Sequence, residues 1–270
     1  MLFEPGGAGG MASAYKAWHR DRGGRLFVVK VLRRDQRGLE HQTESLLAEG
    51  QIHQSIPPHP NLPDYAGHGC EDGECFYAAE YIPGERLAER LARVGRLPER
   101  EALAVCDGLL AALQHILQCG FLYRDVNARN VILHPKGRPV LLDFGLTEPL
   151  EVAGEGKQES YVDGTASFLP PERVLRQGED EASVVYSLGL LLYFMLAGEE
   201  YVRSGTAAQT ALRHIGVRLA VTPAHLPGCS ESTVALVARM IRKDPAERFQ
   251  TFEELRQAIA PILAGRKRNV

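Results

Sequence analysis

Two acidic side chains and one amide, close together in the sequence, could carry out phosphoryl transfer. Asp125 and Asn130 lie in the run YRDVNARN (residues 123–130), and Asp143 opens the triplet DFG (residues 143–145). A carboxylate such as Asp125 can accept the proton of a hydroxyl group. Asn130 and Asp143 offer the oxygen ligands that a hard cation such as Mg²⁺ needs beside nucleotide phosphates. The pattern therefore predicts a phosphoryl-transfer centre.

Two elements must hold these side chains in place. The apolar run Val140 to Leu142 predicts a strand that delivers Asp143, after a turn at residues 134–137. Ahead of the loop, Pro98 opens a segment whose apolar residues follow helical spacing until Gly120, which predicts a buried helix. A helix and a strand give the rigid support that accurate positioning of a site requires.

The loop, the triplet and their order resemble the eukaryotic-type protein kinase superfamily, in particular its bacterial Ser/Thr members. The resemblance covers nearly the whole chain and implies an α+β, bilobal fold. An N-lobe at residues 1–82 would hold a small antiparallel sheet and one helix, a mainly helical C-lobe would follow at 83–264, and 265–270 would be a basic tail. It also implies ATP and Mg²⁺ as cofactors, Asp125 as the catalytic base, and Asn130 and Asp143 as metal ligands.

The segment GAGGMASA (residues 7–14) resembles the glycine loop that covers the phosphates in this family, with Ala12 in place of its third glycine. Gly7, Gly9 and Gly10 would let backbone N–H groups approach the nucleotide without side-chain obstruction. The apolar strand that follows ends at Lys30, which the resemblance places on the α- and β-phosphates.

Lys30 needs an anionic partner, and the helix predicted over residues 43–56 offers Glu44 and Glu49. Glu49 shares a helical face with Ile52 and Ile56. We therefore expect Glu49 to form the ion pair with Lys30 and Glu44 to face solvent.

The segment EYIPG (residues 80–84) resembles the hinge between the lobes. Backbone groups of Glu80 and Ile82 would then bond the adenine edge, and Ile132 belongs to the nucleotide site by the same resemblance. Ala79 stands at the gatekeeper position, where its small side chain should leave an opening behind the adenine.

The residues near Asp125 bear on the acceptor hydroxyl and on regulation. Arg124 predicts regulation by a phosphate on the activation segment, because an arginine fork pairs well with a phosphoryl group. Ser/Thr kinases generally have lysine where this chain has Asn127, whereas tyrosine kinases have arginine where this chain has Arg129. Either cation can stabilise the transferring phosphoryl group, so the clue to the acceptor is mixed at this point.

The segment GTASFLPPE (residues 164–172) resembles the substrate platform of Ser/Thr kinases and favours that acceptor. Ser160, Tyr161 and Thr165 are candidate phosphosites, although such hydroxyls can equally only cap turns. Glu172 should pair with Arg248, as the corresponding residues of the family do.

One departure concerns the helix after this platform, where Val184 replaces the Asp that holds the catalytic-loop backbone in the family. Its loss would loosen the loop and lower activity unless Asp180, Glu181 or Ser183 compensates. A second departure is the short stretch before the glycine loop, which predicts a very short first strand, one supplied by residues absent from this sequence, or one replaced by a partner chain.

These departures keep other functions open. A pseudokinase or scaffold that binds nucleotide weakly is favoured by Val184, Ala12 and the short start, and opposed by the joint presence of Lys30 and the three loop residues. A small-molecule kinase would share the catalytic centre but not the extended activation segment. The prediction is a protein kinase acting on Ser/Thr hydroxyls of protein substrates, with Asp125, Arg129 and Lys30 as catalytic residues.

The composition fits such an enzyme. The 270 residues are 44% hydrophobic and 24% charged, enough for one large core or two small lobes, and the net charge of −3 gives no basis for a nucleic-acid partner. The longest apolar stretch, residues 186–197, is shorter than the ~20 residues of a membrane-spanning helix and predicts a buried helix instead.

The cysteines and the N-terminus indicate the compartment. The five cysteines have no paired CxxC spacing and predict neither a disulfide framework nor a zinc site, which favours a reducing cytoplasm. The first residues lack the basic and then apolar pattern of a signal peptide, so we expect no export.

Overall fold

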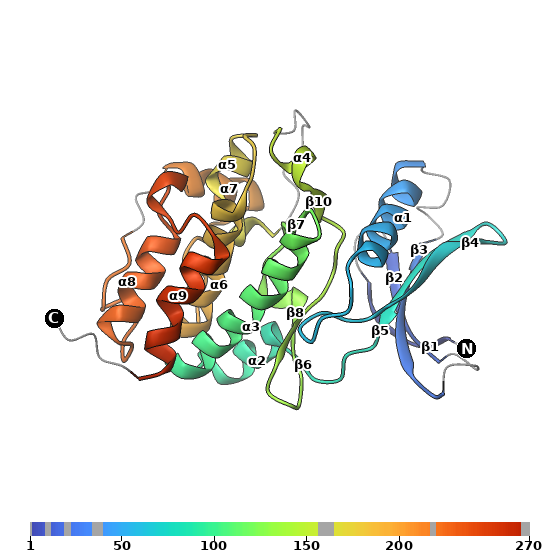
Figure 1. The fold of residues 1–270 in the computed structure, drawn as a ribbon, viewed down its shortest axis with the longest axis horizontal. Coiled ribbons are helices and arrows are strands. Elements are labelled where there is room, and N and C mark those ends of the chain that lie inside the picture. The colour runs from blue at the N-terminus through green and yellow to red at the C-terminus, as the bar shows by residue number, and fades with distance from the viewer. Residues whose placement is uncertain are drawn as a thin grey trace.

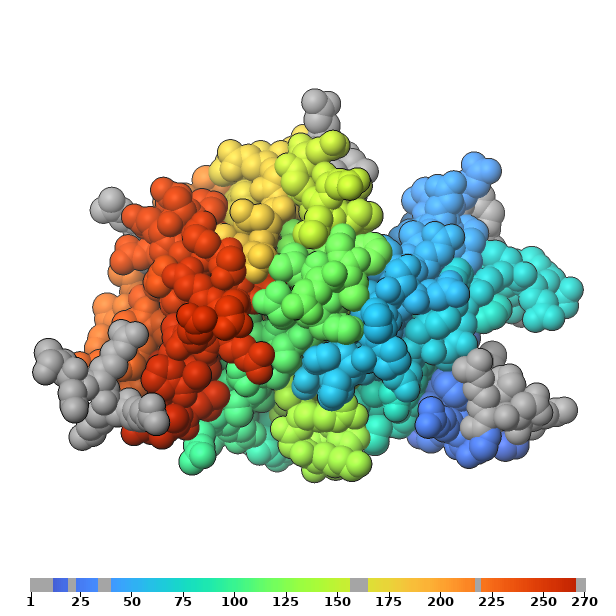
Figure 2. All heavy atoms as spheres, viewed as in Figure 1, coloured from blue at the N-terminus to red at the C-terminus, as the bar shows by residue number. Residues whose placement is uncertain are grey.

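The computed structural model describes residues 2–8, 12–18, 23–33, 40–155, 165–216 and 220–265. Figure 1 shows two parts: a sheet accompanied by one helix, α1, and beside it a larger body of helices. We call these the N-lobe and the C-lobe. The space-filling view shows the two in contact along the segments coloured green and blue (Figure 2). The predicted α+β, bilobal fold is confirmed.

The N-lobe is a five-stranded antiparallel sheet in the order β1-β2-β3-β5-β4. Helix α1 packs against β4 and β5, and a small core of Leu32, Leu46, Tyr77 and Ala79 lies between helix and sheet. The elements are β1 (Leu2–Ala8), β2 (Ala12–Trp18), β3 (Leu26–Leu32), α1 (Glu40–Ser55), β4 (Tyr65–Glu71) and β5 (Glu74–Glu80).

The first strand is not very short. β1 has seven residues, as many as β2 and β3, and it pairs with β2 along its length with irregular register around Pro5. The prediction of a truncated strand was wrong because Pro5, Gly6 and Gly7 are residues typical of a loop. β1 is an edge strand, and proline and glycine are tolerated there.

A disulfide joins Cys70 to Cys75 across the β4–β5 hairpin. The two cysteines face each other in the antiparallel register, and their Cα atoms are 4.0 Å apart. The prediction that the cysteines form no disulfide is therefore wrong for this pair. Sequence spacing alone did not reveal it because the pairing depends on where the hairpin turns.

The C-lobe is built around α6 (Glu181–Ala197), which is buried along almost its whole length. This confirms the predicted buried helix. Helix α3 (Glu99–Gln118) begins directly after Pro98, as predicted, and packs against both α6 and α9 (Phe252–Leu263). The other helices are α2 (Leu87–Val94), α4 (Leu150–Ala153), α5 (Pro171–Val174), α7 (Ala207–Gly216) and α8 (Glu231–Met240). Within the described ranges, no helix combines the length and the apolar character needed to cross a membrane.

Two small sheets hold the loops that face the N-lobe. One has the order β6-β8-β9, from β6 (Glu85–Arg86), β8 (Val131–Leu133) and β9 (Pro139–Leu141). The other pairs β7 (Phe121–Leu122) with β10 (Glu148–Pro149). Together they fix both ends of the segment that contains Asp125, Asn130 and Asp143.

Candidate active site

The catalytic loop runs from β7 to β8 and includes the short 3₁₀ helix η1 (Ala128–Asn130). Asn127 caps this helix: its side-chain oxygen accepts hydrogen bonds from the backbone N–H groups of Arg129 (2.9 Å) and Asn130 (3.2 Å). Its amide also donates to the carbonyl of Asp125 (3.1 Å). Asn127 is also buried, and these bonds fix the loop conformation, which explains why an asparagine can stand at this position.

Asp125 and Asn130 contact each other within the loop. The Asn130 amide donates to Asp125 Oδ2 at 2.8 Å and to the Asp125 carbonyl at 3.1 Å. Burial raises the pKa of Asp125, and the nearby Asp143 carboxylate raises it further, against hydrogen bonds from Asn127 and Asn130 that lower it. A carboxylate whose pKa is raised is a better proton acceptor than an ordinary surface aspartate.

Asp143 follows β9 in a backbone conformation that aspartate adopts only occasionally, with φ of 66°. Its neighbours hold it there: the Leu142 N–H donates to the Asn130 carbonyl (2.7 Å), and the Phe144 N–H donates to Glu49 Oε1 (3.3 Å). Strain of this kind persists where the surrounding structure determines it. In this conformation the residue before Asp143 is bonded to Asn130, and the Asp143 carboxylate reaches Lys30 of the N-lobe.

Lys30 joins the two lobes at this point. Its Nζ lies 2.6 Å from Glu49 Oε1 and 3.0 Å from Asp143 Oδ1. Burial by itself would lower the pKa of Lys30, but the carboxylates of Asp143 and Glu49 outweigh it and raise the pKa. Lys30 therefore keeps its positive charge, and α1 presents Glu49 rather than Glu44 to it.

The two carboxylates beside Lys30 differ. Burial raises the pKa of Glu49 to about 7 in spite of Lys30. For Asp143 burial acts in the same direction, but Lys30 outweighs it and the pKa is lowered. The Asp143 side chain is also 43% exposed. Asp143 is thus the ionised, accessible carboxylate of the pair, as a metal ligand must be.

The residues predicted to bind the adenine, Glu80, Ile82 and Ile132, lie at or near the segment 80–84, where the chain passes from the N-lobe to the C-lobe. β5 ends at Glu80, whose N–H donates to the Asp64 carbonyl (2.8 Å), and Ile82 follows in a buried position. Ile132 pairs with Arg86 in the small sheet. A Cβ at Gly84 would come within 2.8 Å of Ile132 Cγ2 and 2.3 Å of the Leu133 carbonyl oxygen, so only glycine allows this close approach.

The glycine loop, residues 7–14, lies partly outside the described residues. Gly7 belongs to β1 and is opposite Ala14, whereas Gly9 and Gly10 fall outside the part of the chain that the structure describes. Ala14 is in turn opposite Lys30 on β3. The strand after the loop, β2, therefore lies directly beside the strand that carries Lys30, with β1 on its far side.

His53 is a residue of this site that sequence reasoning missed. Its ring stacks on Phe144, with ring centroids 4.3 Å apart. Its two nitrogens contact the hydroxyl of Tyr77 (2.6 Å) and the carbonyl of Pro63 (2.9 Å). His53 lies one turn after Glu49 on α1, so the helical spacing that selected Glu49 could also have found it.

Comparisons with known proteins identify the family of the chain. Residues 4–259 match the model of a family described as the protein kinase domain. The chain belongs to the protein kinase domain family. It is 31% identical to the serine/threonine-protein kinase PknA of Mycobacterium tuberculosis. The alignment is 265 residues long and covers 96% of this chain and 60% of the relative.

Two further relatives extend the comparison. The PknA protein of Corynebacterium glutamicum is 31% identical over 207 residues, covering 76% of this chain and 42% of the relative. The serine/threonine-protein kinase PrkC of Bacillus subtilis is 27% identical over 251 residues, covering 92% of this chain and 38% of the relative. The chain thus spans 38% to 60% of the length of the curated kinases it is compared with.

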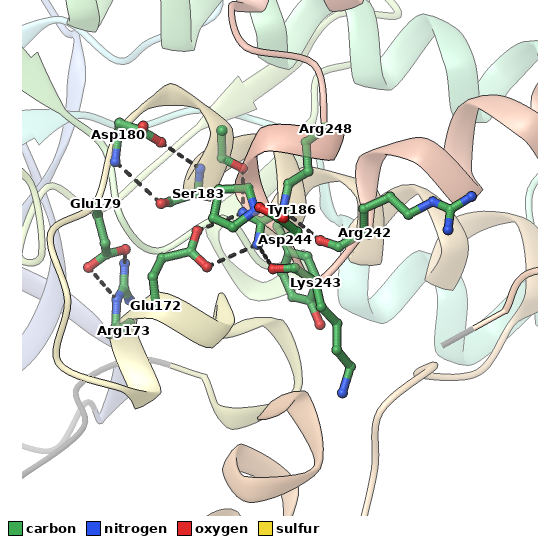
Figure 3. A network of polar contacts seen from close by, with 12 residues as sticks. Glu172, Arg173, Glu179, Asp180, Ser183, Tyr186, Arg242, Lys243, Asp244 and Arg248 are labelled. Atoms are coloured by element: carbon green, nitrogen blue, oxygen red, sulfur yellow. Dashed lines mark hydrogen bonds and ion pairs between the residues drawn. The ribbon is translucent and has the colours of Figure 1, made fainter. Parts of the chain in front are cut away.

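In this kinase domain, the platform after the activation segment is held by the C-lobe. The Ala166 carbonyl contacts His214 Nε2 (2.9 Å), and the Ser167 hydroxyl donates to Glu200 Oε2 (2.7 Å). The predicted ion pair between Glu172 and Arg248 is confirmed, with two contacts of 2.6 and 2.9 Å (Figure 3). Of the three candidate phosphosites, Thr165 lies within the described residues and Ser160 and Tyr161 lie outside them.

The acids expected to compensate for Val184 have other roles. Asp180 and Ser183 cap α6 reciprocally, and Glu181 Oε2 accepts the Phe252 N–H (2.7 Å). An acid that does reach the catalytic loop from this region is Glu179, which pairs with the Arg124 side chain. No sequence signal marks Glu179, since it lies in a turn and meets Arg124 only through the tertiary fold.

Arg129 is exposed at the edge of the loop. Its carbonyl accepts a hydrogen bond of 2.6 Å from Arg86 Nη1. This bond ties the loop to β6, the first strand after the chain crosses into the C-lobe.

Proposed function

We propose that this kinase domain transfers the γ-phosphate of ATP to Ser or Thr hydroxyls of protein substrates. The observation that carries the proposal is the convergence of Lys30, Glu49 and Asp143 from both lobes, beside Asp125 and Asn130 of one loop. A centre of this composition can position a nucleotide, a metal ion and a hydroxyl together, and phosphoryl transfer depends mainly on such positioning and on electrostatic stabilisation.

The residues present fit a magnesium ion. Asp143 supplies an accessible carboxylate whose pKa is lowered by Lys30 against the effect of burial, and Asn130 supplies an amide on the adjacent segment. Across the described residues, no group of three or more His, Cys, Asp or Glu side chains gathers that could hold a metal by itself. This fits Mg²⁺, which commonly takes one or two protein ligands and completes its shell with phosphates and water. Once bound, the ion would neutralise charge on the phosphates.

In the proposed mechanism, each side chain has one task. Asp125, held by Asn130 and Asn127, orients the acceptor hydroxyl and takes its proton. Lys30, fixed by Glu49, holds the α- and β-phosphates. The Arg129 guanidinium helps to neutralise charge in the transition state. Gly7, Gly9 and Gly10 cover the phosphates, and Glu80, Ile82 and Ile132 bind the adenine.

The preference for Ser/Thr rests on two supports: the platform at residues 165–172 and the printed names of the relatives. Autophosphorylation at Ser160, Tyr161 or Thr165 and a place in the cytoplasm belong to the same proposal. Because the Cys70–Cys75 disulfide is unusual for a reducing compartment, the redox state of this pair in the cell tests the location.

Transfer of labelled γ-phosphate from Mg-ATP to the chain itself and to generic protein substrates tests this function. We expect transfer by the wild type, a loss of at least about a hundredfold in Asp125→Asn because the base is removed, and phosphoserine or phosphothreonine as the product. Asp72→Asn is the matched control, because Asp72 is an exposed residue of a turn at positive φ, which asparagine tolerates.

The alternatives predict other results. Absence of transfer by a folded wild type that binds Mg-ATP would support the hypothesis that the chain is a pseudokinase. Phosphotyrosine as the main product would reverse the acceptor preference, and transfer to aminoglycosides but not to proteins would indicate a small-molecule kinase.

A further inference from the structure

Arg124 is enclosed by carboxylates of its own chain. Its Nε donates to Glu179 Oε1 at 2.8 Å and its Nη2 to the same oxygen at 2.5 Å. Its Nη1 lies 2.5 Å from Glu148 Oε2. Each of the three guanidinium nitrogens therefore contacts a carboxylate oxygen. A phosphate could bind this arginine only by displacing or crowding one of the two acids.

A second arginine completes the network. Arg173 of α5 donates from Nε to Glu179 Oε1 (2.9 Å) and from Nη2 to Glu179 Oε2 (2.7 Å), as Figure 3 shows. Two arginines and two glutamates balance in charge, and their side chains are 2% to 14% exposed. We call Arg124, Glu148, Arg173 and Glu179 the Arg124 network.

The charges in the network support one another. Burial alone would raise the pKa of Glu179, but the guanidinium groups of Arg173 and Arg124 outweigh it and lower the pKa. Glu179 is thus ionised although nearly inaccessible. An added phosphate of about −1.5 to −2 charge would meet two carboxylates at this place rather than an unpaired cation, and like charges repel.

The network also connects the segments on which catalysis depends. Glu148 belongs to β10 and is opposite Leu122 of β7, just before the catalytic loop. The Glu179 N–H donates to the Ala153 carbonyl (2.8 Å), and a Cβ at Gly178 would lie 2.2 Å from the Gly154 carbonyl oxygen. The start of the activation segment, the turn before α6 and the residue next to Asp125 are therefore held together.

We propose that Glu148 and Glu179 are positioning residues that supply within the chain the negative charge Arg124 needs, so that Asp125 is held in place without phosphorylation of the activation segment. The proposal rests on the proposed kinase function and replaces the expectation that Arg124 binds an activating phosphate. Glu148 and Glu179 act through Arg124 and touch neither substrate nor nucleotide.

The test compares the wild type, Glu148→Gln and the control Glu151→Gln, each before and after phosphatase treatment, with intact mass as the check for bound phosphate. Glu151 is an exposed acid on the neighbouring helix α4. We expect dephosphorylation to lower the wild-type kcat by less than about tenfold. We expect Glu148→Gln to lose at least about tenfold in kcat while KM for ATP stays within about threefold, because the base and not the nucleotide site is displaced.

Backbone hydrogen exchange of residues 123–130 gives a readout that does not depend on activity. We expect strong protection in the dephosphorylated wild type and in Glu151→Gln, and faster exchange in Glu148→Gln while protection of α6 is kept. A wild type that loses tenfold or more of its kcat on dephosphorylation would overturn the proposal, and so would a Glu148→Gln variant with wild-type kcat and protection. If the wild type binds Mg-ATP but transfers no phosphate, the kinase function fails, and the exchange comparison alone then decides for or against the network.

Discussion

The two lobes each contain a buried glutamate paired with a cation, but the two pairs are built differently. In the C-lobe, Arg248 is fully buried and donates to both Glu172 oxygens and to the carbonyls of Ala182, Arg242 and Lys243. In the N-lobe, Lys30 is 23% exposed and contacts the carboxylates of Glu49 and Asp143, which come from different lobes.

This difference separates stability from function. A buried ion pair whose donors are all used stabilises one conformation, and removal of one partner leaves an uncompensated charge. A pair that remains partly accessible and bridges two lobes can instead receive a ligand, and its charges act on that ligand. The C-lobe pair should therefore affect the free energy of unfolding, and the N-lobe pair the rate of transfer.

The largest effect is expected when the C-lobe pair is broken. Arg248→Met should lower the free energy of unfolding by about 3–5 kcal/mol, because Glu172 is left charged in the core. Denaturant unfolding measures it.

The matched control is Arg256→Met, which removes the exposed pair with Asp107 and should cost less than about 1 kcal/mol. The double variant Glu172→Leu with Arg248→Met should regain part of the loss, because no buried charge is then left alone. Equal losses for Arg248→Met and Arg256→Met would contradict this account of the C-lobe pair.

The N-lobe pair should show the opposite profile. Lys30→Met should lower kcat by about 10²–10³-fold, since a preorganised cation at the phosphates is lost. The free energy of unfolding should fall by less than about 1 kcal/mol, because Glu49, whose pKa is already raised to about 7 by burial, can take up a proton.

Steady-state kinetics and denaturant unfolding of the same preparations check both halves of this prediction, with the exposed Lys136→Met as control. A loss of stability as large as that of Arg248→Met would mean that the two pairs do not differ in the way proposed.

Whether the sequence predicted a feature depended on how far apart in the chain the residues that determine it lie. Asp125, Asn130 and Asp143 were found because they lie in contiguous motifs, and Glu49 because helical spacing distinguished it from Glu44. Glu148 and Glu179 were missed because isolated acids in turns give no pattern, and they meet Arg124 only when β10 and α6 are in place. The length of β1 and the Cys70–Cys75 pairing depend on strand register, which composition does not reveal.

The lobes also share a feature, a buried histidine between a tyrosine and a carbonyl group. His53 contacts Tyr77 and Pro63 in the N-lobe, and His214 contacts Tyr186 and Ala166 in the C-lobe. Burial lowers the pKa of each histidine to about 4. Between pH ~6.5 and ~4 the unfolded chain then binds protons that the folded chain does not, so stability falls as the pH falls, by up to about 3 kcal/mol for each histidine.

His53→Gln and His214→Gln keep polar side chains that do not titrate. Each should make the free energy of unfolding fall less between pH 7 and pH 4.5 than it does in the wild type, and the same substitution at the exposed His41 is the control. Only His53→Gln should also lower kcat, because only His53 stacks on Phe144 beside Asp143. An equal loss of kcat in His214→Gln would remove this distinction between the lobes.

The smallest expected effect concerns the disulfide, which the N-lobe contains and which adds to its small core. Because the bond closes a short loop between Cys70 and Cys75, Cys75→Ser should lower the free energy of unfolding by about 2 kcal/mol under oxidising conditions. In the presence of a thiol reductant the variant and the wild type should be nearly equal, and Cys229→Ser, a free cysteine of the C-lobe, should behave as the wild type in both conditions. β4 and β5 pack directly on α1, which carries Glu49. A loss of stability seen only under oxidising conditions would therefore show that the disulfide helps to stabilise the part of the N-lobe that holds the Lys30–Glu49 pair. Wild-type stability that does not respond to reductant would contradict a contribution from the bond.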